Sequence, residues 1–340
     1  MTSTTTSKKW LFEISFIRPI LLLLLVGYHA FAPYSGAWNG CIVEHNEVYR
    51  WLAYAFRAFR LEAFVFVSGY VFALQVIEKQ KFNNIQALAK SKFKRLIIPC
   101  WLFSVIYILC FGKPTWKIVQ GVGHLWYLPC LFWCFLIGYL VYKKSDIRPS
   151  QCIIALIVLA SISFVPIPLQ INRAMYYFLF FYIGGLFWKN TKLIHNWVSN
   201  KNCIYLWGIF IVLFLGCNIL TNYTLTLFDN YDITGKVIIK MINNISKILL
   251  AFSGISSMYA SAVIFLRNHT LSQKVINIGD YGYGVYIFHQ FILIALYYHT
   301  NLPVIMGSTL LPWIGLIISL SGSLLLSWLF RQTKLGMALI

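Results

Sequence analysis

The sequence predicts an all-α, polytopic integral membrane protein, and three observations support this fold class. Apolar residues make up 59% of the 340 residues, whereas charged residues make up only 11%. Soluble domains usually contain about 25% charged residues. Apolar runs recur along the chain at the length that crosses a bilayer as a helix, roughly 20 residues. Segments of alternating polarity, which are typical of a membrane β-barrel, are absent from the sequence.

About ten segments are apolar enough to be membrane-spanning helices of one bundle. No hydrophilic stretch between them is long enough to form a second domain, so we expect a single transmembrane domain over residues 1–340. The first run has no small-residue cleavage site after it and is expected to be retained. The charged segment 222–240 is expected to be irregular. In chain order the predicted spans are 14–34, 60–77, 96–112, 124–142, 151–166, 173–189, 203–221, 242–266, 281–298 and 308–330.

The basic residues are distributed unevenly between the two sides of these spans. If the N-terminus is cytoplasmic, the inward-facing segments contain 18 of the 28 Lys and Arg residues and the outward-facing segments contain nine. The remaining one, Arg18, lies within the first span. This positive-inside bias predicts ten spans with both termini in the cytoplasm. It also explains the formal net charge of +19 without nucleic-acid binding.

The first predicted helix carries Arg18 and His29 at the two ends of the run "RPILLLLLVGYH". At about 100° per residue, a spacing of eleven residues is about three turns, so both side chains share one face. They are roughly 16 Å apart along the axis. A cation in a span costs about 2.5–3.5 kcal/mol and normally faces a pathway inside the bundle. The alternative is that Arg18 reaches the lipid headgroups while His29 makes an ordinary interhelical hydrogen bond.

Glu62 lies just inside the outer end of the second predicted helix, at about the depth of His29. A carboxylate beside an imidazole fixes the tautomer of the ring and raises its basicity, so this pair could activate a hydroxyl group. The unperturbed pKa of histidine, about 6.5, suits a general base. Glu62 could instead form an ion pair with Arg57 or Arg60, which we otherwise expect to line the cavity for an acceptor.

Three further groups of residues are candidates for the same cavity. His124 lies at the outer start of the fourth predicted helix, where Trp126 and Tyr127 either line the cavity or form an interfacial aromatic belt. His289 lies in the middle of the ninth predicted helix, where a space-filling role is less expected. The pair Ser68-Gly69 predicts close helix packing rather than a nucleophile.

Six motifs, taken in chain order, resemble those of the membrane acyltransferase type 3 family. Their order and their coverage from about residue 18 to 290 carry the resemblance, since each motif is weak alone. The chain departs from the family pattern at Ser15, where many members have an acidic residue, and at Pro19, which directly follows the arginine. The motifs are the Arg18-x10-His29 spacing, "EAFVFVSGY" (62–70), "KFKRLIIP" (92–99), "HLWYLP" (124–129), "FLFFYIGG" (178–185) and "YGYGVYIFH" (281–289).

The resemblance implies an enzyme that uses acyl-CoA as a co-substrate, because the family includes O-acetylases of bacterial glycans and related succinylating enzymes. Lys92, Lys94 and Arg95 lie where the third predicted helix leaves the cytoplasm. The phosphates of CoA are suited to lysine and arginine side chains. The alternative is that these residues only set topology and attract anionic lipids. Outside, segment 35–59 combines charged and aromatic residues in a composition suited to sugars.

We therefore expect a plasma-membrane O-acyltransferase that transfers an acyl group, expected to be acetyl from acetyl-CoA. Acyl-CoA would bind from the cytoplasm near Arg18 and Arg95. His29, oriented by Glu62, would then activate a hydroxyl of an extracytoplasmic or lipid-linked glycan, as a base or as a transient acyl carrier. Membrane lipids are further partners, and no metal, bound cofactor or nucleic acid is expected. The alternative function is a transporter of glycans or lipid-linked sugars whose path these residues line.

Overall fold

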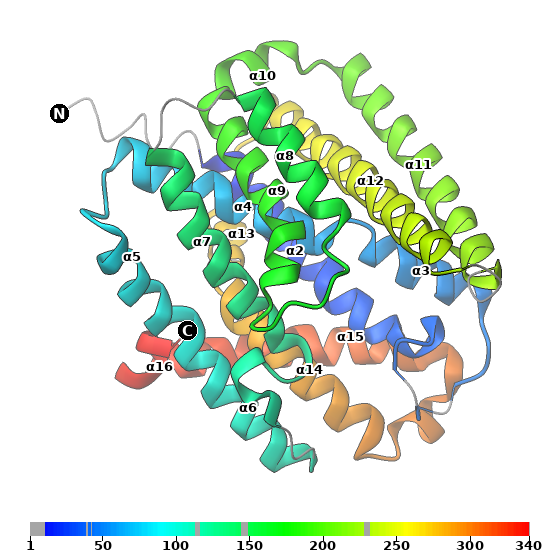
Figure 1. Cartoon of the computed structure of the whole chain (residues 1–340). Coiled ribbons are helices and arrows are strands. Elements are labelled where there is room, and N and C mark those ends of the chain that lie inside the picture. Colours follow the sequence, from blue (N-terminus) through cyan, green and yellow to red (C-terminus); the bar gives the residue numbers. More distant parts are fainter. Residues whose placement is uncertain are drawn as a thin grey trace. The chain divides into compact units, whose positions relative to one another are not determined.

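Every secondary-structure element in the described residues is a helix, which confirms the predicted all-α fold class (Figure 1). It divides into two compact units: unit 1, Met1–Leu61 with Ala262–Ile340, and unit 2, Glu62–Ser261. The expected single domain over 1–340 stays a prediction. The residues that the computed structural model describes are 11–38, 40–41, 43–112, 116–143, 149–227 and 232–339.

Unit 1 is built from the two ends of the chain. Its short helices begin at side-chain caps: Asn46 accepts a hydrogen bond from the Tyr49 amide at the start of α3, and Ser272 accepts one from the Val275 amide at the start of α13. Its elements are α2 (Phe12–Phe31), η1 (Ala32–Ser35), α3 (Glu47–Arg57), α13 (Gln273–Asp280), α14 (Gly282–Tyr298), α15 (Leu302–Arg331) and α16 (Lys334–Leu339).

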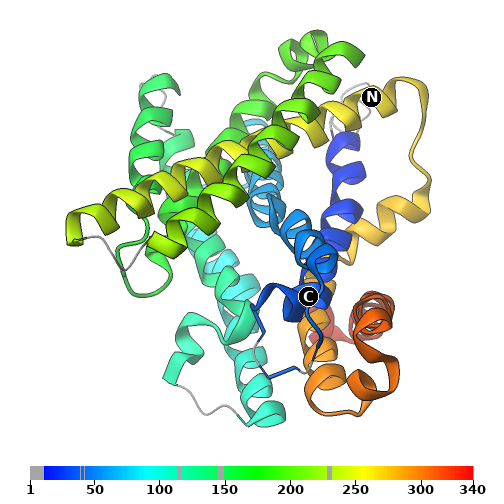
Figure 2. The same ribbon diagram turned by 90° about the vertical axis from the view of Figure 1, so that its right-hand side faces the viewer.

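Helix α2 is the centre of unit 1 and contacts α3, α13, α14 and α15. Its leucines Leu21 and Leu25 are fully buried. Helices α14 and α15 pack closely against one another (Figure 2). A Cβ atom at Gly315 would lie 2.1 Å from the Tyr297 hydroxyl oxygen, so only glycine fits there. That hydroxyl donates a hydrogen bond of 2.9 Å to the Ala30 carbonyl and thereby ties α14 to α2.

Unit 2 contains the middle of the chain, and its described secondary-structure elements are all helices. The first two residues of α4 and the last seven of α12 belong to unit 1. The elements are α4 (Arg60–Ala73), η2 (Leu74–Glu78), α5 (Ile85–Lys92), η3 (Phe93–Ile97), α6 (Ile98–Phe111), η4 (Trp116–Gln120), η5 (Gly123–Trp126), α7 (Tyr127–Lys143), α8 (Pro149–Ser161), α9 (Ile171–Lys189), α10 (Thr191–Trp197), α11 (Asn200–Leu227) and α12 (Ile233–Asn268).

Helices α4 and α9 approach each other closely enough for their backbones to touch. A Cβ atom at Gly69 would lie 1.9 Å from the Phe181 carbonyl oxygen, and one at Gly184 would lie 2.1 Å from the Phe66 carbonyl oxygen. Any larger residue would have to push the two backbones apart. The prediction that Ser68-Gly69 permits close packing is therefore confirmed for Gly69.

Helices α11 and α12 lie side by side in both views (Figures 1 and 2). The Trp207 indole N–H donates a hydrogen bond of 3.0 Å to the Ser261 hydroxyl, and the Asn243 amide donates one of 3.1 Å to the Thr224 hydroxyl. The expectation of an irregular segment over 222–240 was wrong for most of its length. Helix α11 continues to Leu227 and α12 starts at Ile233, whereas residues 228–231 lie outside the described residues.

Each of the ten predicted spans contains helix, and the chain is a multi-pass membrane protein. Three of the predicted spans, which correspond to α8, α9 and α14 with 13, 19 and 17 residues, are not among the seven segments given at the end of this paragraph. The count of ten and the orientation stay predictions. Of the basic residues behind that orientation, Lys8, Lys9, Lys113, Lys144 and Arg148 lie outside the described residues. By length and composition, seven described segments can cross a membrane: Phe12–Ser35, Glu47–Glu78, Ile85–Phe111, Gly123–Lys143, Asn200–Thr224, Ile233–Asn268 and Leu302–Arg331.

Candidate functional site

Arg18 and His29 lie on one face of α2, as their spacing predicts, and this face is turned toward α13 and α14. A Cβ atom at Gly279 in α13 would lie 3.2 Å from the Arg18 Cβ atom. The ring of His29 lies 5.0 Å, centre to centre, from the ring of His289 in α14. We refer to Arg18 and His29 together as the α2 stripe. The stripe runs parallel to the segment that begins at Gly279 and reaches His289.

The buried end of the α2 stripe is a pair of histidines. His29 is 9% exposed and His289 is fully buried, and their rings are tilted by 49° to each other. The Nδ1 atom of His29 and the Nε2 atom of His289 are both shielded from solvent. Around His29, the ring of Tyr28 lies 4.9 Å away and that of Trp38 lies 5.9 Å away. The structure thus brings together two histidines that the sequence analysis proposed separately.

The protonation pattern of His289 follows from one hydrogen bond. Its Nδ1 atom lies 2.9 Å from the Val285 carbonyl oxygen, one turn earlier in α14. A carbonyl oxygen can only accept, so Nδ1 carries the proton and Nε2 holds the lone pair when the ring is neutral. The Ser319 hydroxyl donates a hydrogen bond of 2.8 Å to the His289 carbonyl and fixes this turn of α14 to α15.

At the other end of the α2 stripe, Arg18 forms an ion pair with Asp280. The Arg18 Nη1 atom lies 3.6 Å from the Asp280 Oδ1 atom at the end of α13, and the two side chains are 33% and 56% exposed. Asp280 was not among the residues predicted from the sequence. It lies at the end of α13, whereas His289 lies in α14, and no motif or spacing links Asp280 to Arg18.

Arg60 belongs to the surroundings of His29, whereas Arg57 lies elsewhere. Arg60 is only 5% exposed, and its guanidinium carbon lies 3.8 Å from the centre of the Tyr28 ring. This is a cation–π contact, and the same aromatic ring adjoins His29. Arg57 is exposed and lies 5.2 Å from the centre of the Tyr54 ring. A buried cation is therefore separated from His29 by a single aromatic ring.

Glu62 lies in unit 2, where its partners are aromatic. The Tyr176 hydroxyl donates a hydrogen bond of 3.3 Å to the Glu62 Oε1 atom. Glu62 also interacts electrostatically with Tyr127, another predicted site residue. The sequence analysis missed Tyr176, because 114 residues separate it from Glu62 and no motif links them. His29 and Glu62 belong to different units, so their predicted pairing stays a prediction.

A glycine turn positions His124 and Trp126 in unit 2. Gly121 and Gly123 have φ angles of +86° and +59°, which side chains rarely adopt. A Cβ atom at Gly121 would also lie 2.5 Å from the Trp126 amide nitrogen. The turn leads into η5, where His124 is 6% exposed and its ring centre lies 6.4 Å from that of Tyr107. His124 is thus buried inside unit 2.

Trp126 and Tyr127 form an aromatic cluster that includes a cation. The guanidinium carbon of Arg173 lies 3.9 Å from the centre of the Trp126 ring. The ring of Tyr177 lies 6.0 Å from that of Trp126 and 6.5 Å from that of Tyr127. Such a cluster combines apolar ring faces with O–H and N–H donors.

The three basic residues at the start of the third predicted span have different surroundings. The Lys92 Nζ atom lies 3.6 Å from the centre of the Phe135 ring, in a cation–π contact. Lys94 and Arg95 are exposed and lie in η3, a π-helical turn. Turns of this kind often occur at functional sites. Lys94 and Arg95 are therefore better placed than Lys92 to meet a solvent-borne anion.

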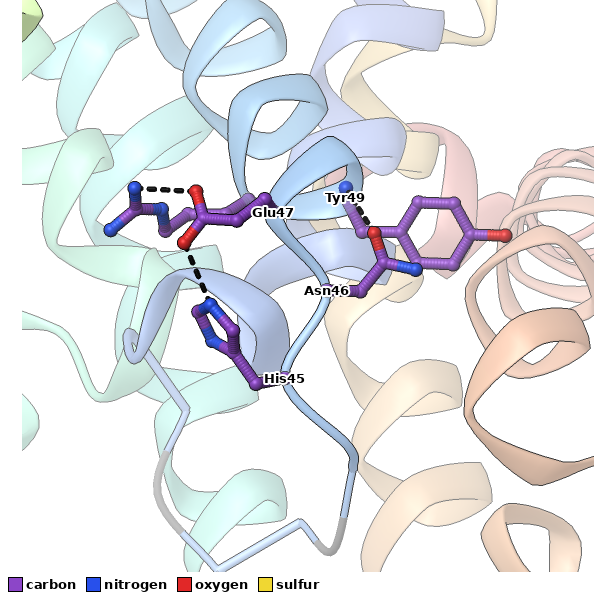
Figure 3. A network of polar contacts seen from close by, with 5 residues as sticks. His45, Asn46, Glu47 and Tyr49 are labelled. Carbon is purple, nitrogen blue, oxygen red and sulfur yellow. Dashed lines mark hydrogen bonds and ion pairs between the residues drawn. The ribbon is translucent and has the colours of Figure 1, made fainter.

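The predicted outer loop 35–59 contains a helix, α3, whose apolar residues lie on one face and whose first turn is capped by Asn46. At the start of α3, His45 Nε2 lies 2.7 Å from Glu47 Oε1, and Arg50 Nη2 lies 2.5 Å from Glu47 Oε2 (Figure 3). The His45 and Glu47 side chains are 70% and 51% exposed. Glu47 thus joins His45 to Arg50 at the start of α3.

No group of three or more His, Cys, Asp or Glu side chains suited to a metal occurs among the described residues.

Comparison with known proteins gives one positive result. A family model described as an acyltransferase domain matches residues 11–332. The matched range covers both units and every candidate residue named above. No curated protein and no solved structure matches the chain significantly.

Proposed function

This chain belongs to the membrane acyltransferase type 3 family, and on that premise we propose that it is a plasma-membrane O-acyltransferase. It moves an acyl group, in this proposal acetyl, from cytoplasmic acyl-CoA to a hydroxyl group of an extracytoplasmic or lipid-linked glycan. The observation that carries the proposal is the buried contact between His29 in α2 and His289 in α14. His29 shares its face of α2 with Arg18.

The proposed chemistry uses His29 as the general base. Its ring accepts the proton of the acceptor hydroxyl while the hydroxyl oxygen attacks the carbonyl carbon of the thioester. The carbon–sulfur bond then breaks, and the CoA thiolate takes the proton from the imidazolium. Glu62 supports the imidazolium by its negative charge. A positioned base contributes about 10²–10⁴ in rate, and a buried site keeps water from competing for the acyl group.

On the donor side, the proposal assigns the CoA phosphates to Arg18, Arg95, Lys92 and Lys94. Guanidinium and ammonium groups form strong charge-assisted hydrogen bonds with phosphate oxygens. The exposure of Lys94 and Arg95 and the partial exposure of Arg18 support this assignment.

On the acceptor side, the proposal assigns the sugar to the aromatic cluster of Trp126 and Tyr127, with His124 and Arg60 as further lining residues. The cation–π contact between Arg173 and Trp126 supports a sugar site, because it leaves donors beside an aromatic face. Arg57 is exposed and remains a peripheral candidate for the acceptor.

The test uses the purified protein in lipid nanodiscs with labelled acetyl-CoA or succinyl-CoA. The acceptor is the glycan fraction from cells that lack the gene. We expect release of CoA and stoichiometric label on the glycan, lost in His29→Ala and retained in His269→Ala, which removes an exposed histidine of the same unit. Movement of unmodified glycan across the bilayer with no label transferred would instead favour the transporter.

A further inference from the structure

His289 lies beside the proposed base, His29, but the mechanism proposed above gives His289 no role. His289 is fully buried and has its Nδ1 proton committed to the Val285 carbonyl, so its lone pair is on Nε2. Its ring centre is 5.0 Å from that of His29. Two imidazole rings that share one N–H···N hydrogen bond of about 2.9 Å have centres about 5 Å apart. The pair therefore has the spacing of a hydrogen-bonded histidine dyad.

We propose that His289 is the positioning residue for His29: its Nε2 atom accepts the Nδ1 proton of His29 and leaves the Nε2 atom of His29 as the basic nitrogen. The proposal rests on the proposed function, since it names the group that orients the proposed base. Catalytic hydrogen bonds of this kind often become short and aligned only when substrate is bound. In this structure the ring centres lie 5.0 Å apart, but the bond between His29 Nδ1 and His289 Nε2 is not formed, and the proposal is that substrate binding brings these two atoms into line.

From the sequence, Glu62 alone was expected both to fix the tautomer of His29 and to support its positive charge. This proposal gives the first role to His289 and leaves the second to Glu62. A neutral imidazole has one N–H group, so only one partner can fix its tautomer. His289 occupies that place within unit 1, on a helix that α2 contacts directly. Glu62 then acts on His29 by charge only. The Ser319 hydroxyl, bonded to the His289 carbonyl, holds the turn of α14 that carries the acceptor nitrogen.

The kinetic test compares two replacements of His289. Gln places its amide oxygen four bonds from Cα, as far as Nε2 of histidine, and can still accept the His29 proton; Leu cannot accept a proton. We expect His289→Leu to lower kcat by about 10²-fold with both KM values within about 2-fold. His289→Gln should recover kcat to within about 10-fold of wild type. Equal losses in the two variants would overturn the proposal. His269→Leu is the matched control.

A second measurement does not depend on activity. In protein labelled with ¹⁵N-histidine, nitrogen chemical shifts report which ring atom is protonated, and His29→Ala identifies the His29 signals. With CoA and glycan bound, we expect His29 to be protonated at Nδ1 in the wild type and to lose this preference in His289→Leu. An Nε2-protonated His29 in the wild type under these conditions overturns the inference even if the variants fail to fold. Absent acyl transfer with the Nδ1 tautomer present would remove the proposed function and leave the histidine dyad standing.

Discussion

The two ends of the α2 stripe lie on one helix face but in opposite surroundings. At one end Arg18 forms an ion pair with Asp280 in which both side chains are partly exposed. At the other end His29 meets His289 in a site with almost no exposure. Exposed ion pairs contribute only about 0–1 kcal/mol to stability. A buried imidazole, by contrast, depends strongly on its few partners, because water cannot replace them.

This difference suggests that one helix serves two tasks. An exposed guanidinium with a weak partner can release it for a phosphate at little cost. A buried ring with a fixed tautomer is preorganised for proton transfer. Substitutions at each end of the stripe test this difference, and they are given in order from the largest expected effect to the smallest.

Replacement of His29 by alanine should have the largest effect. We expect His29→Ala to insert and fold but to lower ester formation by roughly 10²-fold or more, because the base is lost. One interhelical hydrogen bond in a membrane averages only about 0.6 kcal/mol, so packing should survive. Acyl transfer in membranes, normalised to folded protein, measures this. Near-normal transfer would remove His29 from the mechanism.

Replacement of Glu62 by glutamine should have a smaller effect. The amide keeps the shape and can still accept from the Tyr176 hydroxyl, but it loses the charge that supports the imidazolium. We expect a loss of roughly 10-fold, and the double variant His29→Ala/Glu62→Gln should be little worse than His29→Ala, since residues that act together are non-additive. Initial rates of all three variants test this. Strictly additive losses would remove Glu62 as a supporter of His29.

Replacement of Arg95 should affect only the donor. We expect Arg95→Ala to raise the KM for acyl-CoA about 10-fold, the equivalent of one charged hydrogen bond of roughly 1.5 kcal/mol. Kinetics with varied acyl-CoA and fixed acceptor measure this change. Lys94→Ala, which removes a neighbouring exposed cation from the same π-helical turn, is the matched control and should raise KM less. An unchanged donor dependence in Arg95→Ala would limit this residue to membrane topology.

Replacement of Asp280 should have the smallest effect. Asp280→Asn removes a charge from a pair in which both side chains are partly exposed, so the free energy of unfolding should change by less than about 1 kcal/mol. Transfer at saturating donor should stay near wild type. Thermal unfolding in detergent and the transfer assay check both points. A large loss of transfer at saturating donor would mean that Asp280 does more than hold Arg18.

Much of this arrangement could be predicted from local pattern. Hydropathy located helix in all ten predicted spans, and the spacing of Arg18 and His29 placed them on one face. Short amphipathic helices such as α3 were missed, because only one of their faces is apolar. Asp280 and Tyr176 were missed for another reason. Each meets its partner through packing between helices that are distant in the chain, and a single sequence does not show which helices are neighbours.

We propose that Arg18 binds the donor and that His29 transfers the proton, and a donor titration distinguishes these two functions. Transfer rates of Arg18→Ala and His29→Ala are measured in the same membranes over a wide range of acyl-CoA concentration. We expect Arg18→Ala to approach the wild-type rate at high donor, because only binding is weakened, whereas His29→Ala should stay roughly 10²-fold slower at every concentration. Recovery of His29→Ala at high donor, or equal loss of kcat in both variants, would contradict the account.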